Sequence, residues 1–133
     1  MTQEDRELLI KDLSARLPYG VKAEYKNEIF GIEYVSPMYE EVKLDTHETW
    51  TVDVSEVKPY LFPLSSMTEE QKQEYTYIMN YISPDDTDNW KEGEFIYVEQ
   101  FTQLMHFYHK NHLDYRGLIT MGLATDATGL NIY

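Results

Sequence analysis

The spacing of apolar residues predicts a helix at the start of the chain. Leu9 and Leu13 recur at helical spacing behind Thr2, a residue that favours the position just before a first turn. Pro18 cannot continue the pattern, because its ring removes a backbone donor and clashes with the preceding turn. The first helix is therefore expected at about residues 2–17.

From residue 21 the pattern changes to short runs rich in β-branched and aromatic residues. Four such runs, VKAEYK, EIFGIEYV, EVKLD and ETWTVDV, fill residues 21–55 and are separated by turn-forming residues. We expect four antiparallel strands. Strands this short and closely spaced suit a bent or barrel-like sheet, although a flat meander fits the pattern equally well.

An extended connector and a second helix should follow the strands. In residues 56–67 two prolines flank large apolar side chains, which favours an extended, packed segment over a helix. Thr68 and Gln71 then form a capping-box pattern, and Tyr75 and Ile78 begin an apolar stripe at helical spacing. A helix is therefore expected to begin directly after Thr68.

The rest of the chain reads as a helical region over residues 68–124, interrupted by an acidic, turn-rich loop at 83–94. A third helix is expected at about 98–112. Asp114 is placed to cap a last short helix that Gly122 ends. Arg116 is expected to pair locally with Asp114.

Together these elements predict one α+β domain over residues 1–133. It would combine the N-terminal helix, a small antiparallel sheet of about four strands and two to three C-terminal helices. A composition that is 42% hydrophobic and 14% aromatic supplies enough apolar surface for one core. The chain should therefore fold as one unit.

Composition also indicates the cellular compartment of the protein. The chain has no cysteine, so neither a disulfide framework nor a zinc-thiolate site is available. Charged residues interrupt the leucines at the N-terminus, unlike in a signal peptide, and no apolar stretch approaches the length of about 20 residues that crosses a membrane. We expect a cytoplasmic protein that does not enter a membrane.

Charge is the strongest compositional signal. Acidic residues outnumber basic ones by 24 to 11, which gives a formal charge of -13 and disfavours direct binding to nucleic acid or anionic lipid. Residues 39–100 hold 15 of the acids and 4 of the bases. The acidic middle of the chain therefore suits a basic surface on another protein.

Three phrases of the sequence carry a resemblance: LLIKDLSARLPYGVK near the start, EVKPYLFPLSSMTEEQ in the middle and NHLDYRGLITMGLA near the end. In this order they resemble a family of short, functionally uncharacterised proteins from gut Bacteroides genomes and from their phages and mobile elements. The strand region and the acidic loop match that family poorly. The resemblance implies a bacterial or phage context, and it brings no activity and no catalytic residue.

His106, His109 and His112 form the most suggestive spacing for a metal site, because imidazole is a good ligand for zinc. On a helical wheel His112 falls within the apolar stripe, His109 at its edge and His106 on the far side, so the three should not converge. Only His109 and His112 remain candidates. Asp114, His47 or an acidic loop residue would have to complete the site.

The sequence predicts neither a catalytic residue nor a cofactor, because it contains no nucleophile elbow and no glycine-rich phosphate loop. The leading hypothesis is a non-catalytic adaptor or inhibitor that binds another protein through the acidic, aromatic-bearing middle. Strand alternation places Glu41, Lys43 and Asp45 on one face of the sheet. Such a charged face fits a partner-binding surface, but it is equally typical of an ordinary solvent-exposed face. The candidate partner-binding residues are Tyr39, Glu40, Glu41, Asp45, Glu48, Asp85, Asp86, Asp88 and Trp90.

Two alternatives stay open. One is a small metal-dependent enzyme that uses His109, His112 and acidic residues. The other is a self-associating accessory protein of a mobile element, which would form homodimers through exposed tyrosines among the 12 in the chain.

Overall fold

The computed structural model describes residues 1–46, 51–80 and 90–133, with side chains from residue 98 onward in the last range. Its helices are α1 (Gln3–Arg16), α2 (Glu69–Met79) and α3 (Trp90–Lys110), and its short 3-10 helices are η1 (Leu17–Tyr19), η2 (Val54–Glu56) and η3 (Leu64–Ser66). Its strands are β1 (Lys22–Tyr25), β2 (Glu28–Ser36), β3 (Glu41–Leu44), β4 (Val52–Asp53), β5 (Lys58–Pro63), β6 (Leu113–Asp114) and β7 (Thr125–Asp126).

The predicted first helix is confirmed as α1, and a capping box explains where it begins. The Thr2 side chain accepts a hydrogen bond from the Asp5 backbone, and the Asp5 carboxylate accepts one from the Thr2 backbone. Leu9 and Leu13 are buried in the main apolar core together with residues of β1, β3 and η2. This packing holds α1 against the sheet.

The predicted strand region forms an antiparallel meander, but the sheet is larger than expected. Strands β4, β3, β2 and β1 lie in that order, and each pair is antiparallel. The prediction of about four antiparallel strands is wrong for the whole sheet, which has seven strands among the described residues and is mixed. Strand β5 pairs antiparallel with β1, and both β6 and β7 pair parallel to β5.

The extra strands come from segments with weak local signals. The connector predicted at 56–67 is extended as expected, but β5 within it joins the sheet, with Pro59 opposite Ala23. Strands β6 and β7 are two residues long, too short for any alternating pattern. Their pairing depends on β5, which is distant in sequence, and so it is set by tertiary contacts.

The predicted helical region at 68–124 also needs correction. Helix α3 begins at Trp90 rather than at about residue 98, so residues 90–94 of the predicted acidic loop are helical, while residues 83–89 lie outside the described part of the chain. The predicted last short helix is absent from the described residues after α3, which form turns and two short strands. Asp114 caps a turn there, since its carboxylate accepts hydrogen bonds from the backbones of Leu118 and Ile119 at 2.8 and 2.9 Å.

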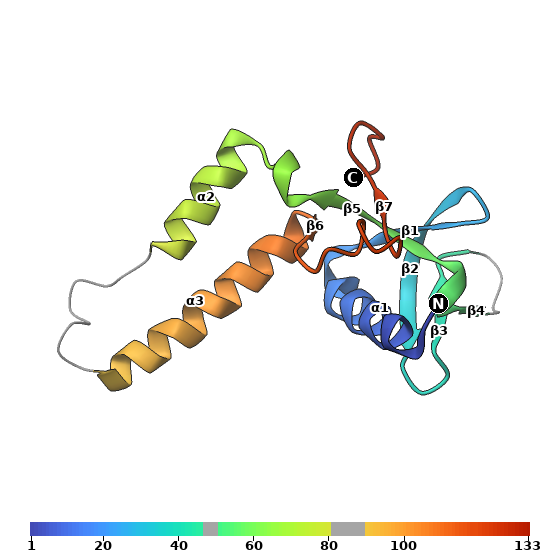
Figure 1. Ribbon diagram of the computed structural model, residues 1–133, viewed down its shortest axis with the longest axis horizontal. Coiled ribbons are helices and arrows are strands. Elements are labelled where there is room, and N and C mark those ends of the chain that lie inside the picture. The colour runs from blue at the N-terminus through green and yellow to red at the C-terminus, as the bar shows by residue number, and fades with distance from the viewer. Residues whose placement is uncertain (47–50, 81–89) are drawn as a thin grey trace.

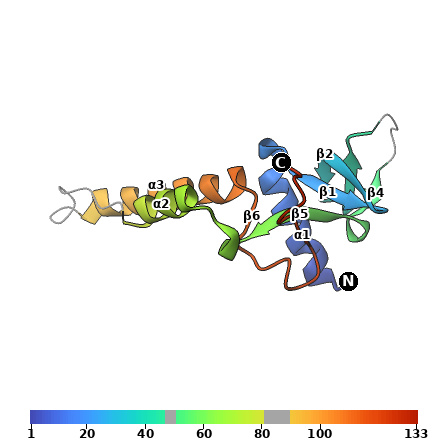
Figure 2. The same ribbon diagram turned by 90° about the horizontal axis from the view of Figure 1, so that it is seen from above.

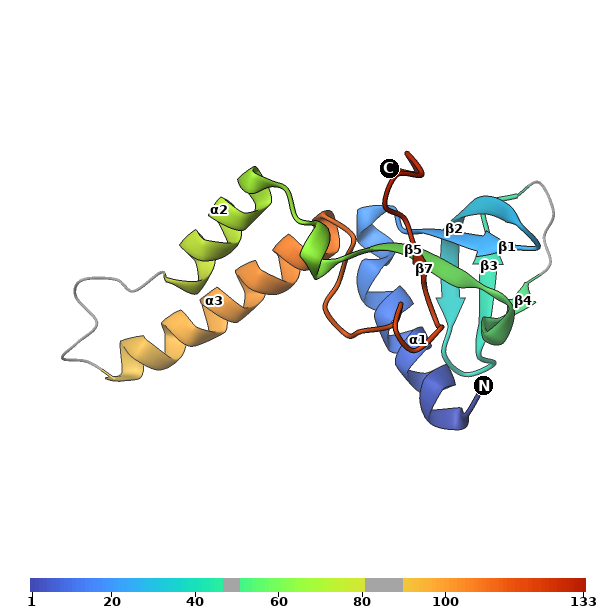
Figure 3. The ribbon, with the colours of Figure 1, turned by 45° about the horizontal axis from the view of Figure 1, so that its top comes forward.

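Helices α2 and α3 form a hairpin that projects away from α1 and the sheet (Figures 1 and 2). Ile78 of α2, Phe107 of α3 and Leu113 of β6 belong to one buried cluster that packs these three elements together. Phe62 of β5 packs against that cluster and against a second one that includes Ile132 near the C-terminus. Figure 3 shows the C-terminal segment with β7 running beside β5. Among the described helices, none is long and apolar enough to cross a membrane.

Candidate binding surfaces

Two of the predicted partner-binding residues, Tyr39 and Glu40, lie at the turn between β2 and β3. Residues 37–40 form this turn, which we call the β2–β3 tip. Two large apolar side chains project from it, with Met38 83% exposed and Tyr39 70% exposed. Exposed residues of these two types are enriched in protein interfaces, so the tip is the first candidate surface.

The base of the β2–β3 tip is held by α1. The Arg6 guanidinium donates from Nε to Glu40 at 3.0 Å and from its two terminal nitrogens to Asp53 at 2.7 and 2.9 Å. Gln3 donates a further hydrogen bond of 2.6 Å to the second oxygen of Glu40. The three side chains of Arg6, Glu40 and Asp53 thus tie α1, the tip and β4 together.

These contacts set the charge states at the tip. Hydrogen bonds from Arg6 and Ser55 lower the pKa of Asp53 well below its usual range, and hydrogen bonds from Gln3 and Arg6 lower the pKa of Glu40. The Arg6 pKa rises correspondingly through its bonds to Asp53 and Glu40. Glu40 is therefore a structural anchor for the tip rather than a free acidic contact for a partner.

The backbone of the tip is also constrained. Glu40 has a φ of 53°, in the left-handed region that a side chain other than glycine seldom adopts. Its carbonyl oxygen accepts a 2.9 Å hydrogen bond from the Val54 backbone, which follows β4. Residues in such a conformation persist where the surrounding structure fixes them, and they concentrate at functional sites.

The other predicted partner-binding residues do not join the tip as one surface. Glu41 accepts a hydrogen bond of 2.6 Å from the Thr51 hydroxyl. Asp45 is exposed at the opposite end of β3, where its backbone donates to Gly31. Trp90 begins α3, and its side chain is outside the described set. Glu48, Asp85, Asp86 and Asp88 lie outside the described residues.

The expectation that Lys43 shares a solvated face with Glu41 and Asp45 is wrong. Lys43 is buried, and its ammonium group donates to the Leu44 carbonyl at 2.7 Å and lies 3.0 Å from the Glu33 carboxylate. The pairing of β2 with β3 shifts register between Ile32 and Tyr34, which interrupts the simple alternation of faces.

The three histidines contact three different tyrosines. His106 Nδ1 lies 2.8 Å from the Tyr19 hydroxyl, and His109 Nε2 lies 2.8 Å from the Tyr115 hydroxyl. The ring of His112 stacks on that of Tyr133 with centroids 3.5 Å apart.

The metal-site alternative gains no support from this placement. The helical wheel separated His106 from His109, yet both rings lie beside Tyr19, with centroids 5.4 and 5.5 Å from it. His112 lies beyond the end of α3 and has a φ of 54°. Within residues 1–46, 51–80 and 90–133, wherever side chains are described, no three acidic or histidine residues are grouped to hold a metal ion. His47 lies outside this part of the chain.

His112 is a buried, neutral base at the junction between the hairpin and the sheet. Burial lowers its pKa to about 4, and the nearby cations Arg16 and Lys22 add to this effect. Its Nδ1 atom is buried without a hydrogen-bond partner. Burial also lowers the pKa of His109. Both rings favour the uncharged form because a protonated ring would lose its hydration beside other positive charges.

A buried ion cluster next to His109 and His112 was not predicted. Asp12 and Arg16 are both fully buried in α1 and joined at 2.8 Å, and Arg116 donates to the other Asp12 oxygen at 3.1 Å. Both guanidinium groups lie over the Tyr115 ring, at 5.2 and 4.9 Å. The expected local pair of Arg116 with Asp114 is therefore wrong, since Arg116 reaches across to α1.

A signal for this cluster was present in the sequence. Asp12 and Arg16 stand four residues apart and occupy the same helical face as the buried Leu9 and Leu13. Charged residues at core positions of a helix are expected to be paired when buried. The cluster holds α1 to the segment after α3, because Arg16 also donates to the Leu113 carbonyl at 2.7 Å.

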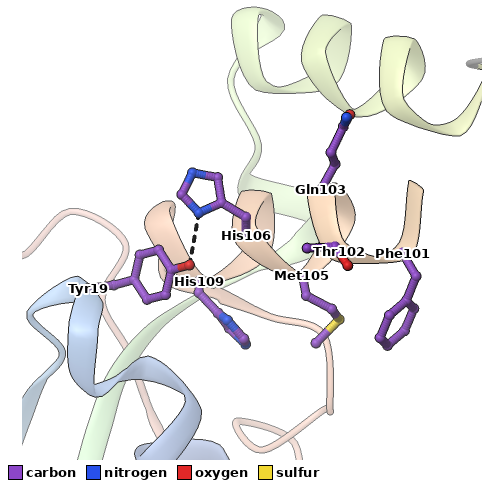
Figure 4. Close-up of a pocket in the computed structure, with 7 residues that line it drawn as sticks. All are labelled: Tyr19, Phe101, Thr102, Gln103, Met105, His106 and His109. Atoms are coloured by element: carbon purple, nitrogen blue, oxygen red, sulfur yellow. Dashed lines mark hydrogen bonds between the residues drawn. The ribbon is translucent and has the colours of Figure 1, made fainter. Parts of the chain in front are cut away.

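A cleft lies between η1 and one face of α3 (Figure 4). Its volume is about 480 Å³. Tyr19 and His109 form one side of the cleft, and Phe101 and Met105 project into the other side (Figure 4). Thr102, Gln103 and His106 complete the lining. The cleft is mainly apolar, so it is suited to apolar side chains more than to a charged ligand.

Comparison with known proteins adds no relative: no family model, no curated protein and no solved structure matches this chain. The resemblance carried by the three sequence phrases therefore stays a prediction.

Proposed function

We propose that this chain is a non-catalytic protein-binding module, an adaptor or an inhibitor, that docks on a basic surface of its partner through the β2–β3 tip. The single observation that carries the proposal is the pair of exposed apolar side chains, Met38 and Tyr39, on a turn whose base is fixed by Arg6. Tyr39 belongs to the binding surface predicted from the sequence, and Met38 is an addition to it.

The rigidity of the tip favours binding. A loop that becomes ordered only in a complex loses conformational entropy on association, and that loss weakens the affinity. Here Arg6 holds Glu40 and Asp53, and the Glu40 carbonyl is bonded to the Val54 backbone, so much of the ordering is already present. Tyr39 and Met38 can then act as anchors that fill pockets on the partner.

Charge supports a basic partner. The chain has a net charge of -13, and Glu4 and Glu7 are exposed on the first turns of α1. This is the part of α1 whose Gln3 and Arg6 side chains reach the tip. Carboxylates beside an apolar anchor steer a positively charged surface toward it and reject an acidic one.

The test compares capture by three forms of the tagged, full-length protein from a bacterial lysate at low and high salt. These are the wild type, a Met38→Ser/Tyr39→Ser variant, and a Leu130→Ser control that removes an exposed apolar side chain near the C-terminus. Each captured protein is identified by mass spectrometry. The expected result is a basic protein retained by the wild type and the control, lost from the tip variant and released by high salt.

A direct measurement follows with the purified partner by calorimetry. Loss of two anchors should raise the dissociation constant by at least about 30-fold, whereas Leu130→Ser should leave it unchanged. The proposal is refuted if the tip variant captures the same proteins with the same affinity as the wild type. It is equally refuted if no protein distinguishes the two.

A further inference from the structure

Two buried polar atoms lie where the end of α1 meets the segment after α3, and neither has a hydrogen-bond partner among the described residues. They are the Nη1 atom of Arg16 and the Nδ1 atom of His112. Arg16 is fully buried and His112 is 8% exposed. A buried polar atom without a partner is costly, and the cost is larger for a charged group. Two such atoms in one region therefore need a physical explanation.

The two atoms belong to groups that lie close together. The other terminal nitrogen of Arg16 donates a hydrogen bond of 2.7 Å to the carbonyl of Leu113, the residue that follows His112. Burial is the first cause of the low pKa of His112, and Arg16 is the largest of the charged causes. An electrostatic effect of this kind weakens with distance. The guanidinium of Arg16 therefore borders the imidazole of His112.

The carboxylates near Arg16 are already engaged elsewhere. Asp12 lies 2.8 Å from Arg16 and 3.1 Å from Arg116, so one carboxylate serves two guanidinium groups. Asp114 accepts hydrogen bonds from two backbone N–H groups of the turn that follows it. Neither carboxylate bonds to the Nη1 atom of Arg16, which leaves a buried, charged donor without an acceptor.

The electrostatic environment of His112 is positive. Among the described residues, the charged groups that shift its pKa are Arg16 of α1 and Lys22 of β1, and both are cations. Asp12 is not one of them, so its pairing with Arg16 does not cancel the positive potential at the imidazole. This region is therefore locally positive in a chain whose net charge is -13.

The two unpaired atoms are suited to an anion. Arg16 Nη1 can only donate hydrogen bonds, and neutral imidazole donates from Nδ1 when that nitrogen carries the ring proton. Two donors beside cations favour a negatively charged ligand over a metal ion or a neutral molecule. Two donors also fit a small, singly charged ion better than phosphate or sulfate, because each oxygen of those ions would need partners of its own.

We infer that this junction is a binding site for a halide ion, chloride in the first place, which accepts hydrogen bonds from Arg16 Nη1 and His112 Nδ1. The ammonium group of Lys22 donates to the Ile132 carbonyl at 2.9 Å and adds positive charge from β1. The bound ion links α1 to the residue that follows α3, and so it strengthens the attachment of the helical hairpin. The site shares no residue with the β2–β3 tip, and the two proposals are independent.

The first test compares thermal melting of the full-length protein at pH 7 in sodium chloride and in sodium gluconate. Both salts are used at about 200 mM, so that general screening is the same and only the small anion can enter the site. Variants of His112 measure the effect of each salt on the rest of the chain. Asparagine and aspartate are matched in size, and both tolerate the φ of 54° at this position.

His112→Asp places a carboxylate beside Arg16 and so takes the place of the ion. The difference in melting temperature between chloride and gluconate should be about 4 °C larger in the wild type than in His112→Asp. His112→Asn keeps an N–H donor on the atom next to Cγ, as Nδ1 is in histidine, and should keep the response to chloride. The inference is overturned if the wild type and His112→Asp respond equally to chloride.

The second test locates the ion. Crystals of the wild type grown in sodium bromide are measured at the bromine absorption edge, where bromide and water are distinguished by anomalous scattering. The expected result is an anomalous peak within hydrogen-bonding distance of Arg16 Nη1. Density at this atom without an anomalous signal would identify a buried water molecule instead and would overturn the inference.

Discussion

Acid should destabilise this protein between pH 6.5 and pH 4 through His112. The imidazole is buried against Tyr133, and Arg16 from α1 and Lys22 from β1 lie close enough to oppose its protonation. Its pKa is about 4 in the folded chain, against an ordinary value of 6.5. The unfolded chain therefore binds a proton in this interval and the folded chain does not, so the stabilisation present at neutral pH is lost as the pH falls.

The size of the effect follows from the two pKa values. A full separation from 6.5 to about 4 corresponds to about 3 kcal/mol of unfolding free energy, of which about 2 kcal/mol is lost between pH 7 and pH 5. The lowered pKa of His109 acts in the same direction. The carboxylates with lowered pKa values, Glu40, Asp53 and Asp126, affect stability mainly below pH 5, since their own protonation is needed.

Urea unfolding at pH 7 and pH 5 measures this loss. His112→Asn is the informative variant, because asparagine does not titrate here and tolerates the positive φ of 54° at this position. It should be less stable than the wild type at pH 7 through loss of the Tyr133 stack, yet should lose about 2 kcal/mol less on going to pH 5. His106→Asn, at an exposed imidazole, should keep the full pH dependence. Equal pH dependence in the wild type and His112→Asn would refute the reasoning.

Three further predictions concern stability and binding. Asp12→Asn should lower the unfolding free energy by about 3–5 kcal/mol in urea, because it leaves two arginines without their buried counter-charge; a loss under about 1 kcal/mol would contradict this. Arg6→Ala should lower the unfolding free energy only slightly in the same assay but should weaken partner capture through Tyr39, and capture equal to that of the wild type would contradict a role of the Arg6 ion pairs in binding. Phe107→Ala should cost about 3–5 kcal/mol, visible as a lower midpoint of urea unfolding, and a neutral effect would contradict the packing described.

Local signals predicted the elements that local contacts define. The capping box at Thr2 and the one at Thr68 gave the starts of α1 and α2, because each depends on residues only three positions apart. The four strands of the meander were found from composition and turn residues. The start of α3 was placed too late, since Gly93 and the acids around it resemble a loop in sequence although the backbone there is helical.

Contacts between distant residues could not be predicted in this way. Strand β6 forms because Leu113 pairs with Phe62 of β5. Arg116 donates a hydrogen bond to Asp12, which lies 104 residues earlier in the chain. At the candidate site, Tyr39 and Glu40 were predicted from charge and aromatic content. Met38 and the ion pairs of Arg6 were not predicted. Nothing in the sequence around Glu40 indicates that a residue of the first helix will neutralise it.

The parallel pairing of β5 with β6 brings the two ends of the helical hairpin together at the sheet. The chain leaves the sheet after Pro63 and returns at Leu113, and these two ends are joined by the hydrogen bond of 2.8 Å from the Phe62 backbone to the His112 carbonyl. Matched changes in the lengths of α2 and α3 would therefore move the far end of the hairpin by about 5 Å per helical turn without altering the sheet. The length of the α2–α3 hairpin can therefore change during evolution while the sheet and the β2–β3 tip stay the same.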